Sequence, residues 1–212
     1  MLYLFLNGVD LLTCLFYLVV LIFSATIHEI AHAWTAYKLG DPTAKHMGRI
    51  TLNPKVHLTK MGTMAMLLLP IGWANPVMIN PRNFRKPQRD SVLVSIAGPL
   101  SNLLLCFVSI FIFVTAEKYQ TNALMAAVLQ TCSMLAYINA LLLVFNLIPF
   151  PPLDGSRIFT VWLPYKVREF LWRIEQYGII VLFLIVRVFA RPINWLMTFV
   201  IDGIYNFWHI FF

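Results

Sequence analysis

The chain has 212 residues, of which 60% are hydrophobic and 12% charged, and its mean hydropathy is +0.76. This composition excludes an ordinary soluble globular domain and indicates an all-α polytopic membrane protein. The net charge of +7 does not predict nucleic-acid binding, because the basic residues lie in short blocks between apolar runs. Basic blocks in such positions set membrane topology and contact anionic lipid headgroups.

Five apolar runs predict about five transmembrane helices. A bilayer core needs about 20 apolar residues in a helix, and the first three runs reach that length. The last two are separated by Arg191-Pro192 and interrupted by Arg187 and Asp202, so they predict a hairpin less clearly. The runs cover residues 11–39, 91–116, 122–148, 177–190 and 193–212.

Two shorter segments are expected at the membrane surface. Residues 61–73 are apolar but broken by glycine and proline, which favours a re-entrant or interfacial element. Residues 164–175 alternate charged and apolar positions in an amphipathic helical pattern. The whole predicts a single integral membrane domain over residues 1–212, with a core at about 9–157 and C-terminal helices at about 164–212.

The segment His28-Glu29-Ile30-Ala31-His32 places two imidazoles and a carboxylate inside the first apolar run, which is therefore not expected to be a cleaved signal peptide. Residues four apart share a helix face, so His28 and His32 can bind one ion. Glu29 can then take a proton from water at that ion, as in zinc metalloproteases. The motif also arises by chance, but each of these groups costs roughly 2–3 kcal/mol or more to insert at membrane depth.

A catalytic zinc takes three protein ligands and leaves one position open. The third apolar run ends in residues 146–155, NLIPFPPLDG, where three prolines in four positions stop a helix and unwind the backbone before Asp154. An exposed Pro-rich loop with an Asp-Gly turn is the alternative interpretation. Beside an intramembrane HExxH, Asp154 is the best candidate for the missing ligand, and Asp202 is its rival.

Several further residues have a structural interpretation beside a functional one. Gly98 and Asn102 share a helix face that permits simple packing, or close approach and one interhelical hydrogen bond that holds the first helix in place. His57 follows a turn and is a possible site-lining residue, whereas His46 is expected in an exposed loop. The cysteines form no CxxC pair and are interpreted as packing residues: Cys14, Cys106 and Cys132.

The basic residues also predict orientation. Five lie in the segment after the first helix, four before the second helix and four after the third. Positively charged loops stay cytoplasmic, so the C-terminal ends of the first and third helices face the cytoplasm if residues 61–73 do not cross. The histidine pair and Asp154 then belong to one side of a multi-pass cell-membrane protein, with the site open toward the cytoplasm.

Three motifs in order resemble the site-2 protease family of intramembrane zinc metalloproteases. They are HEIAH at 28–32, Gly98-Pro99-x-x-Asn102, and Asn146-x-x-Pro149 followed by PLDG at 152–155. The resemblance implies that His28, His32 and Asp154 bind one zinc ion and that Glu29 is the catalytic base. It implies that Asn146 faces the site and binds the substrate backbone or the developing oxyanion.

Residues 49–84 resemble the short branch of that family, which lacks an inserted PDZ domain. Asn75, within Trp73-Ala74-Asn75-Pro76-Val77, is a candidate substrate-binding residue, and Asn102 a possible site-lining one. The turn-rich stretch 75–87 could hold substrate as an added strand. The expected partners are a transmembrane protein substrate and the lipid bilayer.

The expected reaction is hydrolysis of a peptide bond within or near a substrate's transmembrane segment. A zinc or proton transporter is one alternative, because intramembrane histidines and carboxylates also mark ion pathways. A catalytically inactive membrane chaperone of the same fold is another. Glu29→Gln distinguishes a transporter from a protease, because hydrolysis requires a base next to the first histidine and transport does not.

Overall fold

The computed structural model describes residues 8–59, 62–64, 75–119, 122–175, 178, 184–185 and 187–211. These residues form helices and turns without a β-strand, as the composition predicts. The chain divides into two compact units, Met1–Asp90 and Ser91–Phe212.

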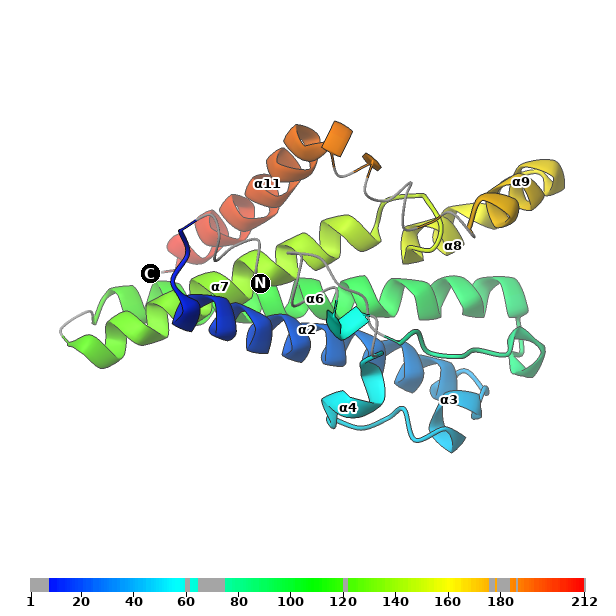
Figure 1. Ribbon diagram of the computed structural model, residues 1–212, viewed down its shortest axis with the longest axis horizontal. Coiled ribbons are helices and arrows are strands. Elements are labelled where there is room, and N and C mark those ends of the chain that lie inside the picture. The colour runs from blue at the N-terminus through cyan, green and yellow to red at the C-terminus, as the bar shows by residue number, and fades with distance from the viewer. Residues whose placement is uncertain are drawn as a thin grey trace. The chain divides into compact units, whose positions relative to one another are not determined.

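The first unit is built on α2, Leu11–Lys38, which confirms the first predicted helix. Asp10 caps its N-terminus by accepting a hydrogen bond of 2.9 Å from the Thr13 backbone N–H. Two short helices, α3 (Thr43–His46) and α4 (Pro54–His57), pack beside its C-terminal half (Figure 1).

The segment 75–83 passes the same half of α2 in an extended conformation and ends in the short 3₁₀ helix η1, Pro81–Asn83. The burial of its side chains alternates: Val77 is buried and Met78 is exposed. Val77 packs with Ala33 of α2 and Ala44 of α3. The inward side chains thus fix this extended stretch to the helix.

The second unit contains most of α6, Pro87–Glu117, and all of α7, Ala123–Asn146, which run antiparallel to each other (Figure 1). Both confirm predicted helices, although α6 begins four residues earlier than expected. Pro87 suits the first helical turn, and Asp90 accepts a 2.9 Å hydrogen bond from the Lys86 N–H. Cys106 and Ile110 of α6 pack against Ala136 of α7, and all three cysteines are buried and free.

Three further helices complete this unit: α8 (Asp154–Thr160), α9 (Tyr165–Glu175) and α11 (Ala190–His209). α11 packs along α7, with Ile193 and Met197 against Val144. α9 has one apolar and one charged side, as predicted for residues 164–175.

Three described helices are long and apolar enough to cross a membrane: α2, α6 and α7. They correspond to the first three predicted spans, and the expected total of about five is not confirmed. α11 covers most of the fifth run without reaching the same apolar character, because Asn194, Asp202 and Asn206 interrupt it. The predictions for residues 61–73 and 177–190 fall largely outside the described residues.

Candidate metal centre

His28 and His32 converge on one face of α2. Both side chains are buried, and their Nε2 atoms lie 3.0 Å apart, with the two rings edge to face. The spacing follows from the helix itself, because residues four apart lie one above the other. Local helix geometry alone therefore brings the two imidazoles together.

This pair fits a zinc ion. A tetrahedral ion with Zn–N bonds of 2.0–2.1 Å holds two ligand nitrogens about 3.3 Å apart, close to the observed separation. At this distance one Nε2 donates a hydrogen bond to the other, or both bind one shared cation, depending on the ring tautomers. The donor chemistry and spacing of the pair thus fit two ligands of a catalytic zinc, and the assignment of His28 and His32 as ligands stays a prediction.

Glu29 lies next to the pair and is half-buried. Its Oε2 accepts a hydrogen bond of 3.2 Å from the backbone N–H of Val77 in the extended segment. The remaining carboxylate oxygen is then oriented by a contact that comes from outside α2. Sequence spacing predicts the position of Glu29, but gives no sign of this contact.

His57, Asn75 and Arg49 form a buried polar cluster in the same unit. The Asn75 backbone N–H donates to the His57 carbonyl at 2.6 Å, and the Asn75 side-chain oxygen accepts from the guanidinium of Arg49. Arg49 also donates to the Val56 carbonyl at 2.6 Å. The polar atoms of Asn75 are thus used to join the residues around 49–57 to the start of the extended segment.

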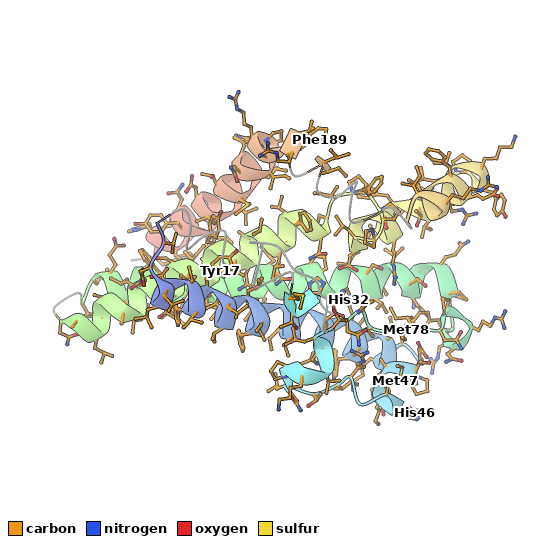
Figure 2. All side chains as sticks on the ribbon, in the orientation of Figure 1. Tyr17, His32, His46, Met47, Met78 and Phe189 are labelled. Carbon is orange, nitrogen blue, oxygen red and sulfur yellow. The ribbon has the colours of Figure 1, made fainter. Side chains whose placement is uncertain are left out.

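His57 is only 1% exposed, and its Nε2 lies 2.9 Å from the Thr51 carbonyl oxygen. Its Nδ1 has no hydrogen-bond partner within the described part of the chain. His57 therefore supports a loop, and its proposed place at the site stays a prediction. His46 is exposed, as expected, but it is the last residue of the short helix α3 and does not lie in a loop (Figure 2).

In the second unit, α7 ends at Asn146 and α8 begins at Asp154, which confirms that the prolines end the third helix. The Asn146 Nδ2 donates to the Leu142 carbonyl at 2.9 Å. Asp154 is half-buried in the first turn of α8. A turn over residues 147–153, and not a continued helix, therefore presents this carboxylate.

Gly155 is required by the packing of that turn. A Cβ at this position would lie 2.5 Å from the Ile148 carbonyl oxygen and in still closer contact with that of Leu147. No side chain fits there unless the backbone moves. The glycine after Asp154 thus allows α8 to start directly against the last residues of α7.

Asn102 is fully buried and donates a hydrogen bond of 2.9 Å from its Nδ2 to the Oδ1 of Asn139. This bond confirms an interhelical hydrogen bond at Asn102, but it joins α6 to α7, and the expected support of the first helix stays a prediction. Whether Asn102 lines the site stays a prediction. Asp202, the rival ligand, is exposed on α11.

A histidine pair with an adjacent carboxylate, on a helix of membrane-spanning length, defines the class of this protein as a membrane metallopeptidase. Comparison with known proteins gives the same class. Peptidase family M50 matches residues 16–121 and 116–188. The chain therefore belongs to peptidase family M50, the site-2 protease family, and is a zinc metalloendopeptidase.

Individual relatives agree. The chain is 47% identical to the candidate zinc metalloprotease YwhC of Bacillus subtilis over 182 residues, which cover 84% of this chain and 82% of YwhC. It is 28% identical to the candidate zinc metalloprotease Rip2 of Mycobacterium tuberculosis, over 81% of this chain and 65% of Rip2. It is also 28% identical to the zinc metalloprotease MJ0392 of Methanocaldococcus jannaschii, over 70% of this chain and 34% of the relative. No solved structure matches the chain.

Proposed function

We propose that this protein hydrolyses peptide bonds within or near the transmembrane segments of membrane-protein substrates. The depth of the histidine pair on α2 carries this proposal. α2 has 28 residues, and at 1.5 Å per residue His32 and His28 lie about 9 and about 15 Å before its end at Lys38. Peptide bonds of a neighbouring membrane helix lie at the same depth.

The C-terminal end of α2 supports an assignment to the membrane surface. Trp34 and Tyr37 are exposed there, with the Lys38 ammonium 5.3 Å from the Trp34 ring centroid and the Lys45 ammonium 4.1 Å from that of Tyr37. Aromatic and basic side chains are enriched at the membrane–water interface. Together with the basic loops, this supports a multi-pass protein whose site opens to the cytoplasm.

Asp154 is the proposed third ligand, which with His28 and His32 binds one zinc ion. The support is the need of catalytic zinc for three protein ligands and the unwound, glycine-dependent turn that presents Asp154. This assignment requires that the two units act as one integral membrane domain.

Zinc held at this site would polarise the scissile carbonyl of the substrate and make water more acidic at neutral pH. Glu29 would take a proton from water at the site and later deliver it to the leaving amine. Its contact with the Val77 N–H keeps one oxygen in place, so that the other can receive the proton. A helical substrate hides its amides in hydrogen bonds and must unwind locally before it reaches Glu29.

Substrate contacts are assigned to two asparagines and one segment. The Asn146 side-chain amide binds the substrate backbone or the developing oxyanion. Asn75 is placed at the start of the segment 75–87, which holds the unwound substrate as an added strand. The extended backbone and alternating burial of residues 77 and 78 support this role. His57 and Asn102 are further residues proposed to line the site.

The test compares the native chain with Glu29→Gln, both reconstituted in liposomes with a panel of single-span membrane proteins. The native chain is expected to cleave at least one, and Glu29→Gln to reduce cleavage by at least about 100-fold with zinc content unchanged. Glu117→Gln, an exposed site at the end of α6, is the matched control and keeps activity. Equal cleavage by native chain and Glu29→Gln ends this proposal, and zinc transport by both variants would favour a transporter.

A further inference from the structure

The contact between Val77 and Glu29 depends on how firmly the extended segment 75–83 is held. Val77 donates its backbone N–H to Glu29 Oε2 at 3.2 Å, and its side chain is buried between α2 and α3. Figure 2 shows Met78, the next residue, on the segment that passes α2. A shift of this segment along α2 moves the hydrogen bond that orients the catalytic carboxylate.

Asp41 fixes the C-terminal part of the segment. One carboxylate oxygen accepts from the Asn80 backbone N–H at 2.7 Å, and the other accepts from the Asn83 Nδ2 at 2.7 Å. The second oxygen also accepts from the backbone N–H and the hydroxyl of Thr43. Three of the four donors thus contact one carboxylate oxygen and one contacts the other, and Asp41 is fully buried.

Asp41 is itself part of the end of α2. Its backbone N–H donates to the Ala36 carbonyl at 2.9 Å, so the carboxylate is tied to the helix that carries Glu29. Gly40 makes this turn with φ of +109°, a conformation that favours glycine. The carboxylate that holds the segment is therefore tied directly to the helix that carries Glu29.

We propose that Asp41 is a positioning residue of the proteolytic reaction: by holding Asn80 and Asn83 it keeps the Val77 amide at Glu29. The proposal rests on the proposed function. It deepens that function by adding a residue that touches neither metal nor substrate. Arg49 and Asn75 hold the other end of the segment, so that loss of Asp41 loosens it from one side only.

The experiment uses the full zinc-loaded chain and Asp41→Asn, which keeps the size of the side chain but turns an NH₂ group toward donors. Asp10→Asn, at the exposed far end of α2, is the matched control, since asparagine also caps helices. Hydrogen exchange of residues 75–83, zinc content, and kcat and KM on a single-span protein that the native chain cleaves are measured.

Asp41→Asn is expected to speed exchange at Val77 and Asn80 and to lower kcat by about 10- to 100-fold, with KM within about 2-fold and zinc unchanged. Asn83→Ala removes one of the four donors and shifts both readouts less, in the same direction. Unchanged kcat with faster exchange overturns the positioning role, and unchanged exchange shows that Asp41 does not hold the segment.

If kcat falls only in proportion to lost zinc, Asp41 is merely structural. A native chain that cleaves nothing contradicts the proposed function instead, and the exchange measurement still decides the anchor.

Discussion

α2 and the turn at residues 147–153 each carry part of the proposed zinc site, and they are built in opposite ways. His28, Glu29 and His32 lie within one unbroken helix of 28 residues, whose geometry sets the 3.0 Å between the two imidazole nitrogens. Asp154 instead follows a break between two helices, where no periodicity fixes its direction. Its orientation depends on the prolines that end α7 and on the room left at Gly155.

The two parts are therefore expected to lose zinc in different ways when they are substituted. A substitution on α2 removes a ligand and leaves the helix, because the neighbouring turns keep their hydrogen bonds. A substitution in the turn moves the backbone, so that the Asp154 carboxylate is displaced from the ion although Asp154 itself is unchanged. Substitutions that remove a ligand outright are the strongest test of this difference.

The largest effect is expected from removing ligands. His32→Ala and Asp154→Ala should each lower zinc affinity by more than about 100-fold, since loss of a group that merely supports a ligand already costs 10- to 100-fold. Zinc stoichiometry of the purified protein, measured by elemental analysis, falls from about one to well below it. The helical content should stay unchanged for His32→Ala.

Two exposed residues are the controls for these ligands. His46→Ala on α3 and Asp202→Ala on α11 remove the same chemical groups and should keep zinc near one ion per chain. Zinc that survives Asp154→Ala but is lost in Asp202→Ala shows that the rival carboxylate is the third ligand.

The same contrast explains what the sequence predicts and what it does not. The helix at 11–38 and the histidine pair follow from local periodicity, and the end of α7 follows from proline chemistry. The role of Asp41 does not, because its partner Asn80 is 39 positions away and only tertiary packing joins them. Asp41 and Arg49 both lie in a segment whose composition is that of a polar loop. Composition therefore gives no indication that their side chains are buried.

Gly155→Ala tests the turn without touching a ligand. The added Cβ meets the Leu147 and Ile148 carbonyl oxygens, so the backbone must shift, and overpacking of this kind costs typically about 1–3 kcal/mol. We expect a lower free energy of unfolding in mixed micelles and a fall in zinc content. Gly203→Ala on α11 is the matched control, since nothing lies within 4 Å of its added Cβ and alanine favours a helix. Full zinc in Gly155→Ala contradicts the view that this turn positions Asp154.

A smaller effect is expected from the buried Asn102–Asn139 pair, which holds α6 to the helix that precedes the turn. Interhelical hydrogen bonds in membranes contribute about 0.6 kcal/mol on average and up to about 1.7. Asn102→Ala should therefore lower the free energy of unfolding by about 1 kcal/mol while zinc stays bound. A double-mutant cycle with Asn139→Ala isolates the pair, and additive losses would show that the contact contributes nothing.

The smallest expected effect is the loss, at low pH, of the stability that Asp41 contributes at the C-terminal end of α2. Burial opposes ionisation of Asp41, but hydrogen bonds from Thr43, Asn83 and Asn80 outweigh it and hold the pKa of its carboxyl below the usual value of 3.8. A group whose pKa is lower in the folded state stabilises the fold above its unfolded pKa, and this contribution is lost as pH falls through the folded value.

The thermal midpoint of the native chain should therefore exceed that of Asp41→Asn by a few degrees at pH 6, since about 1 kcal/mol shifts a chain of this size by about 2–4 °C. The gap should narrow as pH drops below about 4, because only the native chain has a carboxylate to protonate at this position. A gap that stays constant from pH 6 to pH 3 would mean that Asp41 acts through shape and not charge. The two halves of the site would then differ less than proposed, since α2 would rely, like the turn at 147–153, on packing to place its catalytic group.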